Sequence, residues 1–245
     1  MTQDEKTTWK VPALFRRVQP WDDKWLLRLN AKEESKFTRF VEFFSFLGRF
    51  GFWILVIAVF IFVWYDPYAA LYLGLNIGVG VTVVYFIKVF VRRPRPFRVT
   101  PGVKVWEGPN TSASFPSWHA YNGVANVLAL YVVFKFEWVV LVIGIPLAIC
   151  LGLTRPFLGV HYLTDIIAGW VIGCLGFALS YLLTPFFLSY YVSIEAILPW
   201  AHDWGTWGTF VGEWWFWIIF IGGVFAFLYV TVYRRKKRKT KVEWR

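Results

Sequence analysis

A small set of charged and polar residues stands at the ends of apolar stretches, where charge is costly and therefore marks function. These residues are Lys88, Arg95, Ser117, His119, Arg155, His161 and Asp165. Arginine offers a planar fork of donors that matches phosphoryl oxygens, and lysine adds a compact positive charge. His161 and Asp165 are four residues apart, so on one helix they share a face and the carboxylate can orient the imidazole. The pattern predicts phosphoryl transfer, in which one imidazole attacks phosphorus and His119 protonates the departing oxygen.

Two histidines and an aspartate could instead bind a metal ion, which is the main alternative. The neighbouring cations disfavour a divalent ion, and no third neutral ligand is near, so we expect neither a metal nor another cofactor. A purely interfacial role would explain Lys88 or Arg92 alone. It does not explain why two of only three histidines stand beside these cations. The third, His202, we interpret as an interfacial residue.

The composition places these residues in a membrane protein. The chain has 245 residues, of which 58% are apolar, 22% aromatic and 17% charged. Soluble domains carry about 25% charged residues, so this composition excludes an ordinary soluble domain and, equally, a disordered chain.

A membrane-spanning helix needs about 20 apolar residues. The segments that meet or approach this length are Phe43–Tyr65, Tyr68–Val91, Ser117–Phe136, Trp138–Arg155, Tyr162–Leu183 and Trp214–Tyr233. They predict an all-α fold, a polytopic membrane helix bundle with six transmembrane helices. The apolar stretch Pro185–Pro199 is short and contains Glu195, so we interpret it as interfacial or re-entrant.

Small residues and cysteines add little to this picture. Gly74 with Gly78, and Gly169 with Gly173, have the spacing that permits close helix contact, which we attribute to ordinary bundle packing. The two cysteines lie inside apolar runs and do not indicate a disulfide framework.

The basic residues are distributed unevenly along the chain. A basic N-terminal segment, residues 1–39, precedes a transmembrane domain at 40–233, and a basic tail follows at 234–245. With six spans, these two ends and the loop at 92–115 share one side and hold 22 of the 26 Lys and Arg residues. The positive-inside rule makes that side cytoplasmic. The tail would anchor the last span or attract anionic lipid head groups. If Pro185–Pro199 also crosses, the two basic ends fall on opposite sides.

Three motifs occur in order, namely Lys88-x6-Arg95-Pro96, Pro116-Ser117-Trp118-His119 and Thr154-Arg155-x5-His161-x3-Asp165. Their order, spacing and placement resemble the signature of the type 2 phosphatidic acid phosphatase superfamily. That superfamily includes integral-membrane lipid phosphate phosphatases, glucose-6-phosphatase and vanadium haloperoxidases. The resemblance covers residues 40–183 and is more specific than any single motif.

The resemblance implies a role for each matching residue. His161 would be the nucleophile that forms a phosphohistidine, Asp165 would orient it, and His119 would be the general acid. The phosphate oxygens would be held by Lys88, Arg95, Ser117 and Arg155. Members of the family work without a metal, which agrees with the charge argument above.

The sequence departs from the family pattern at two positions. Trp118 stands where the family has glycine, and Thr154 replaces a serine but keeps the hydroxyl. Glycine permits close approach of the backbone to phosphate. Trp118 can still contribute its backbone N–H to substrate binding, and its ring would either line an acyl or prenyl channel or pack between helices.

We therefore expect a metal-independent phosphatase acting on a lipid phosphomonoester or a polyprenyl diphosphate in the bilayer. Candidate substrates are phosphatidic acid, phosphatidylglycerophosphate and undecaprenyl diphosphate. Related lipid phosphotransferases generally lack a residue matching Arg155, which favours hydrolysis. The alternatives are a lipid phosphotransferase and a non-enzymatic anion or lipid transporter. No nucleic-acid partner is expected, and the sequence leaves the oligomeric state open.

Overall fold

The computed structural model describes residues 10–64, 66–108 and 111–197. Within these ranges the chain forms helices joined by turns and loops, without a β-strand. In order they are η2 (Ala13–Phe15), α1 (Gln19–Leu29), α2 (Lys36–Phe44), η3 (Ser45–Gly48), α3 (Phe50–Phe62), α4 (Pro67–Val91), α5 (Pro96–Val99), α6 (Trp118–Val133), α7 (Trp138–Phe157) and α8 (Leu163–Ile197). The all-α class is confirmed for this part of the chain.

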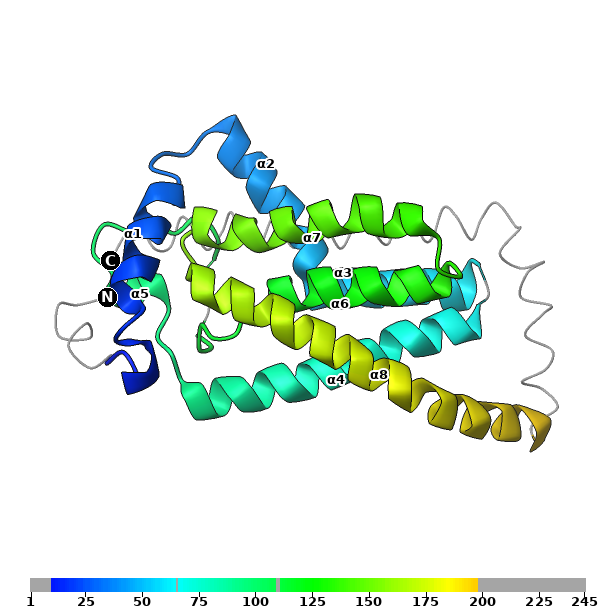
Figure 1. Cartoon of the computed structure of the whole chain (residues 1–245). Helices are drawn as coiled ribbons and strands as arrows, with labels where there is room; N and C mark the ends of the chain where they lie inside the picture. The colour runs from blue at the N-terminus through cyan, green and yellow to red at the C-terminus, as the bar shows by residue number, and fades with distance from the viewer. Residues whose placement is uncertain (1–9, 65, 109–110, 198–245) are drawn as a thin grey trace.

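Helix α6 is the centre of the bundle and packs against α4, α7 and α8 (Figure 1). Gly169 and Gly173 bring α8 close to it, because a Cβ on Gly169 would lie 2.7 Å from the carbonyl oxygen of Ser117. A Cβ on Gly173 would lie 2.9 Å from the carbonyl oxygen of Tyr121. This glycine pair therefore makes the close helix contact that its spacing predicts.

The other glycine pair does not make such a contact. A Cβ on Gly74 or Gly78 would meet nothing within 4 Å among the described residues. The contact lies instead at Gly80, where a Cβ would be 2.2 Å from the ring of Tyr121. The buried residues Asn76, Gly80 and Val84 are spaced at four, so they form the face of α4 that meets α6, and Gly74 and Gly78 lie off that face.

The first predicted span is broken rather than straight. The segment predicted at Phe43–Tyr65 is formed by α2, η3 and α3, with a bend of 55° between the two halves. The first half begins earlier, at Lys36, because the side chain of Ser35 accepts from the backbone N–H of Thr38 and caps it. The second half begins after Arg49, whose extended backbone interrupts the helix.

The apolar stretch after Pro185 is not a separate element. Helix α8 continues through Pro185 to Ile197, so the prediction of an interfacial or re-entrant segment at Pro185–Pro199 is wrong up to residue 197. Proline removes only one backbone donor from the helix. The residues on both sides of Pro185 are mostly apolar, and in an apolar environment a continuous helix is favoured because it pairs the remaining backbone N–H and C=O groups with one another. Residues 198–199, the predicted span Trp214–Tyr233 and the basic tail lie outside the described residues.

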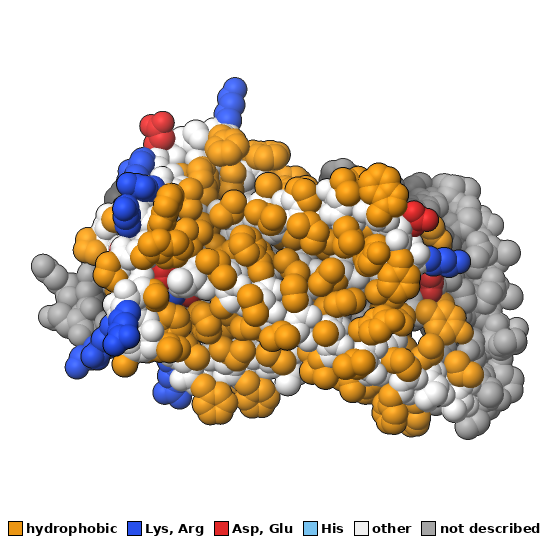
Figure 2. Space-filling view, viewed as in Figure 1, with side chains coloured by type: hydrophobic (Ala, Val, Ile, Leu, Met, Phe, Trp, Pro, Cys, Tyr) orange, Lys and Arg blue, Asp and Glu red, His pale blue; other side chains and the backbone are white. Residues whose placement is uncertain are grey.

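Within the described ranges, three helices, α4, α7 and α8, are long and apolar enough to cross a membrane, and the bent pair on either side of Arg49 makes up to four. Helix α6 has 16 residues, fewer than a full span needs. Figure 2 shows hydrophobic side chains over the middle of the visible face, with Lys and Arg gathered at the end where α1 and α5 lie. An exposed surface this apolar fits a lipid environment, with the basic end in the polar region.

Candidate active site

The residues that the sequence singles out come from separate elements that meet at one end of the bundle (Figure 1). Lys88 lies in the last turn of α4, and Arg95 is the N-cap of α5. Ser117 is the N-cap of α6, and Arg155 lies in the last turn of α7. Asp165 lies in the first turn of α8. The fold therefore gathers these positions, which are distant along the chain, at one depth in the bundle.

His161 stands in the connection between α7 and α8, and its contacts indicate its tautomer. Its Nε2 lies 3.3 Å from Nη1 of Arg95, and its Nδ1 lies 3.4 Å from Oδ2 of Asp165. An arginine can only donate, so we assign Nε2 as the acceptor and place the ring proton on Nδ1, facing the carboxylate. The imidazole thus presents a lone pair toward the cations and an N–H toward Asp165.

A glycine shapes the connection that carries His161. Gly159 has a φ of +75°, a left-handed conformation that other residues adopt rarely. A Cβ there would lie 2.2 Å from the carbonyl oxygen of Lys104. Only glycine therefore allows the connection to turn sharply after α7 while the loop at residues 100–107 packs directly against it.

The electrostatic surroundings keep His161 neutral. The residue is 2% exposed, and burial lowers the pKa of its imidazole well below the ordinary value. The positive charges of Arg95, Lys88 and Arg155 lower the pKa further. A neutral imidazole retains the lone pair that a nucleophile needs.

Lys88 and Arg95 are held by neutral main-chain carbonyls. Nζ of Lys88 donates to the carbonyls of Ala113 at 2.7 Å and Ser114 at 3.3 Å. Nε of Arg95 donates to the carbonyl of Ser112 at 2.9 Å, and Nη1 donates to that of Val160 at 3.0 Å. Carbonyls orient these cations without neutralising them, so their charge stays available to an anion.

Arg155 is paired with a carboxylate that the sequence analysis did not single out. Its Nη2 lies 2.5 Å from Oε2 of Glu107, and its Nη1 donates to the hydroxyl of Ser45 at 2.5 Å. The other carboxylate oxygen, Oε1, lies 2.6 Å from Nη2 of Arg49. Burial alone would raise the pKa of Glu107, but the charges of Arg155, His119 and Arg49 outweigh it and lower the pKa. Glu107 is therefore an anion held between two arginines.

His119 lies in the first turn of α6, next to η3. Its Nε2 is buried and has no hydrogen-bond partner among the described residues. The ring packs against Gly48, where a Cβ would lie 2.4 Å from Cδ2 of the imidazole. The missing side chain of Gly48, at the break in the first span, therefore leaves room for the imidazole of His119.

Ser117 and Trp118, at the start of α6, make contacts within the helix bundle. Ser117 is fully buried, and its hydroxyl accepts from the backbone N–H of Ala120, as expected of an N-cap. The ring of Trp118 stacks on that of Tyr121, with centroids 5.6 Å apart, and packs in a cluster with Val84. Of the two positions predicted for this ring, the structure shows the one between helices.

Four residues of the site were missed, namely Asp22, Arg49, Arg93 and Glu107. In the sequence, Arg93 is one of several basic residues of the loop at 92–115, and Asp22 lies in the basic N-terminal segment. The signal that could have found them is the scarcity of acids, because the chain has only 15 Asp and Glu residues and 26 Lys and Arg. Any acid held inside such a chain is expected to pair with an arginine. Across the ranges that the structure covers, no three His, Cys, Asp or Glu side chains are grouped to hold a metal ion.

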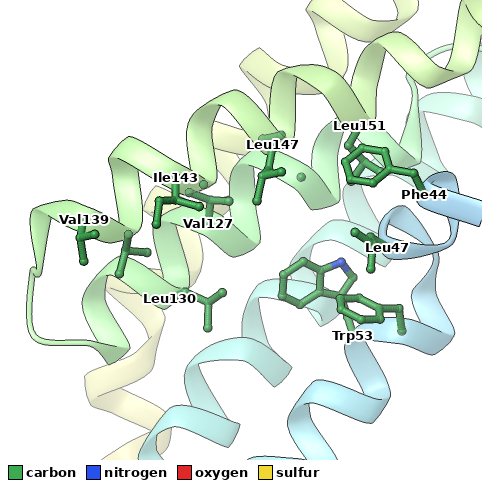
Figure 3. Close-up of a pocket in the computed structure, with 14 residues that line it drawn as sticks. Phe44, Leu47, Trp53, Val127, Leu130, Val139, Ile143, Leu147 and Leu151 are labelled. Carbon is green, nitrogen blue, oxygen red and sulfur yellow. The ribbon is translucent and has the colours of Figure 1, made fainter. Parts of the chain in front are cut away.

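An apolar cavity of about 370 Å³ lies between the bent first span and helices α6 and α7 (Figure 3). The bent first span contributes Phe44, Leu47 and Trp53, and helices α6 and α7 form the other walls. The volume is within the range of small-molecule sites, and the lining is almost entirely hydrocarbon.

Helical spacing connects the cavity to the site. On α6, Gly123 lines the cavity four residues after His119. On α7, Leu151 and Leu147 line it four and eight residues before Arg155. Residues four apart lie on one helix face, so the faces that carry His119 and Arg155 continue as the cavity walls.

Comparisons with known proteins agree with this geometry. The model of the PAP2 superfamily matches residues 69–189. An undecaprenyl-diphosphatase of Sulfolobus acidocaldarius is 25% identical over 146 residues, which is 59% of this chain and 69% of that protein. Phosphatidylglycerophosphatase B of Bacillus subtilis is 36% identical over 77 residues, 28% of this chain, and the match spans only 38% of that relative.

Two solved structures share the fold. The crystal structure of a transmembrane PAP2-type phosphatidylglycerolphosphate phosphatase from Bacillus subtilis has a TM-score of 0.57 and 22% identity, covering 68% of this chain and 85% of that one. The structure of Aquifex aeolicus LpxE also has a TM-score of 0.57, with 23% identity, covering 66% of this chain and 94% of that one. At this identity the likeness concerns the arrangement of helices.

Proposed function

Since the chain belongs to the PAP2 superfamily and is a phosphatase of that family, we propose that it hydrolyses a membrane lipid phosphate through a phosphohistidine on His161. The observation that carries the proposal is the orientation of this imidazole. Its Nε2 faces Arg95 at 3.3 Å, and its Nδ1 faces Asp165 at 3.4 Å. A buried, neutral nucleophile thus points its lone pair into a cationic pocket.

In the first step, the lone pair on Nε2 of His161 attacks phosphorus as the bond from phosphorus to the leaving oxygen breaks. His119, protonated on entry of the phosphate, transfers its proton to that oxygen. The phosphohistidine ring becomes cationic, and the carboxylate of Asp165 stabilises that charge.

In the second step, His119 takes a proton from water, and the water oxygen attacks phosphorus. The bond from phosphorus to Nε2 breaks, orthophosphate leaves, and His161 is neutral again. Lys88, Arg95 and Arg155 stabilise the charge on the transferring phosphoryl group, and Ser117 shapes the pocket floor as the α6 cap.

A substrate phosphate has to displace Glu107 from Arg155. The carboxylate carries a single charge on two oxygens, whereas a phosphate monoester carries nearly two charges on three oxygens. Arg155, Arg95 and Lys88 together favour the more highly charged ligand by simple attraction. We therefore assign Glu107 as the anion that occupies the pocket in the absence of substrate.

The apolar cavity would hold a hydrocarbon chain of the lipid. It continues the faces of α6 and α7 that bear His119 and Arg155, so a lipid with its phosphate in the pocket would place its chain against Leu147 and Leu151 (Figure 3). Candidate head groups are those of phosphatidic acid, phosphatidylglycerophosphate and undecaprenyl diphosphate, of which the last two are the substrates that the relatives' names state.

We place the protein in the cell membrane or an internal membrane with six spans, and both termini and the active site on the cytoplasmic side. The support is the gathering of Lys and Arg at the end of the bundle that carries the site (Figure 2). Tags at each terminus, probed from either side of sealed vesicles, test this topology. Tags accessible from opposite sides would contradict it.

The direct test measures orthophosphate release by the purified full chain in detergent, with each candidate lipid as substrate. His161→Ala should lower the rate by at least about 1,000-fold, because it removes the nucleophile. The matched control is His202→Ala, since the mechanism does not use His202, and it should keep full activity. Unchanged release by His161→Ala would refute the proposal. Product analysis with an added lipid alcohol distinguishes hydrolysis from phosphotransfer.

A second test concerns the cavity. Leu147→Trp fills it without touching the polar site, so kcat/KM for a long-chain lipid phosphate should fall about tenfold. Hydrolysis of a short-chain, water-soluble analogue should be unchanged. An equal loss for both substrates would contradict the assignment of the cavity to the lipid chain.

A further inference from the structure

Behind Asp165, on the side away from His161, lies a buried ion-pair network that includes the N-terminal segment. Nη1 of Arg93 lies 2.7 Å from Oδ1 of Asp165, and Nη2 of Arg93 lies 2.7 Å from Oδ2 of Asp22. The side chains of all three residues are 0% exposed. Asp22 comes from α1, Arg93 from the loop after α4, and Asp165 from α8.

Both terminal nitrogens of the Arg93 guanidinium are bound, whereas its Nε has no hydrogen-bond partner among the described residues. Besides the two carboxylates, Nη1 donates to the hydroxyl of Thr164 at 2.7 Å, and Nη2 donates to Oε1 of Gln19 at 2.9 Å. Its carbon lies 4.1 Å from the ring centroid of Phe15 and 4.0 Å from that of Tyr162. Because its two terminal nitrogens are both bound and its plane contacts two aromatic rings, the guanidinium of Arg93 is held in one orientation.

Asp22 also holds the start of α8 directly. Its Oδ1 accepts from the backbone N–H of Thr164 at 3.0 Å, and its Oδ2 accepts from the Thr164 hydroxyl at 2.5 Å. A carboxylate from another part of the chain therefore caps the helix turn that contains Asp165. Asp165 itself accepts from the backbone N–H of Tyr162 at 3.0 Å through the oxygen that faces His161.

We propose that Asp22 and Arg93 are positioning residues for the reaction, acting on His161 through Asp165. This inference rests on the proposed function. Arg93 fixes the direction of the Asp165 carboxylate, and Asp22 shares the positive charge of Arg93. Asp165 therefore keeps enough negative charge to hold the Nδ1 proton and to stabilise the cationic phosphohistidine. Asp22 thus takes part in positioning the nucleophile, although it precedes every family motif.

This chain of contacts predicts an effect on turnover rather than on substrate binding. Asp22→Asn keeps the shape of the side chain and removes its charge. The carboxylate of Asp165 is then the only anion paired with Arg93, so Arg93 offsets more of its negative charge. In the full-length protein we expect kcat for orthophosphate release to fall about 10- to 100-fold, with KM changed by less than about twofold. Asp22→Glu, which restores the charge, should recover part of kcat.

The matched control is Asn30→Ala. Asn30 is 2% exposed and also ties the N-terminal segment to the body of the protein, through the carbonyls of Lys104 and Phe157. It does not touch Arg93. A merely structural role for the N-terminal segment would make both variants lose thermal stability and activity together. The inference requires that Asn30→Ala keep kcat at equal or lower stability.

A spectroscopic readout covers the case in which Asp22→Asn folds poorly. The chain has three histidines, so ¹⁵N-histidine labelling gives few signals, and His161→Ala identifies the relevant one. Gln19→Ala removes only a neutral acceptor of Arg93 and should shift the His161 nitrogen signals in the same sense as Asp22→Asn, by less. Unshifted signals together with unchanged kcat in both variants would overturn the inference. If His161→Ala still releases orthophosphate, the proposed function fails instead, whatever Asp22→Asn does.

Discussion

Two arginine clusters flank His161, and they are built for different tasks. Arg93 lies between the carboxylates of Asp22 and Asp165, and all three side chains are fully buried. On the other side, Glu107 lies between Arg155 and Arg49, and these side chains are 10%, 3% and 28% exposed. The first, which we call the closed cluster, has two anions around one cation. The second, the open cluster, has two cations around one anion.

The difference explains which cluster can change its partners. In the closed cluster, both terminal nitrogens of Arg93 are paired with buried carboxylates of the chain, so exchanging either carboxylate for a ligand would leave a buried carboxylate unpaired. In the open cluster, the single carboxylate of Glu107 pairs with two arginines and leaves a net positive charge, so a more highly charged anion can take its place. In the proposed mechanism, one cluster holds the nucleophile, and the other receives the phosphate.

The largest effect is expected from breaking the closed cluster. Arg93→Met leaves Asp22 and Asp165 buried without a cation, which costs about 3–5 kcal/mol of folding stability. Thermal unfolding in detergent measures this loss. Arg49→Met, the matched change in the open cluster, should cost less than about 1 kcal/mol because that side chain is partly exposed. Equal losses in both variants would remove the distinction between the clusters.

Replacing the guanidinium of Arg155, which receives the phosphate in the proposed mechanism, should affect catalysis more than stability. Arg155→Lys keeps the charge but loses the fork, and we expect kcat/KM to fall about 100-fold through weaker stabilisation of the transferring phosphoryl group. Initial rates of orthophosphate release measure it. Arg98→Lys, a basic residue at the end of α5, is the control and should lie within about twofold of the wild type. A full-rate Arg155→Lys enzyme would show that the fork is not needed.

His161 and the open cluster should respond to acid in different pH ranges. The lowered pKa of His161 means that the unfolded chain takes up a proton first, so stability falls as the pH drops below about 6.5. The lowered pKa of Glu107 has the same sign, but its loss begins only below about 4.3. Because the attacking imidazole must be neutral, the acidic limb of kcat/KM should lie below about 6.5. A limb above that value would contradict a neutral buried nucleophile.

The smallest effect is expected at the exchangeable carboxylate. Glu107→Gln removes the anion that competes for Arg155 and Arg49, so vanadate, which mimics the transferring phosphoryl group, should inhibit about three- to tenfold more tightly. Inhibition constants from rate measurements test this. Asp23→Asn, which removes an acid of α1 outside both clusters, should leave inhibition unchanged. Weaker inhibition of Glu107→Gln would mean that Glu107 helps to bind the anion.

Much of the site could be predicted because the lengths of the apolar runs indicate where helices end. The apolar runs place Lys88, Arg155 and Asp165 at span ends, and the i, i+4 spacing places Asp165 beside His161. The break at Arg49 was not predicted, since an arginine near the start of an apolar run also fits an ordinary span end. The passage of α8 through Pro185 was not predicted either, because proline ends some helices and is tolerated in others.

By itself, the sequence determined that this is an apolar, helix-forming chain with several cations and two imidazoles at the ends of its predicted helices. Those properties depend on local composition and on spacing within one turn, which each segment carries with it. Only the tertiary structure decided that Asp22 and Arg93 lie behind Asp165 and that Glu107 lies on Arg155. A buried charge takes whichever partner the packing of distant segments brings within reach, and no local pattern encodes that partner.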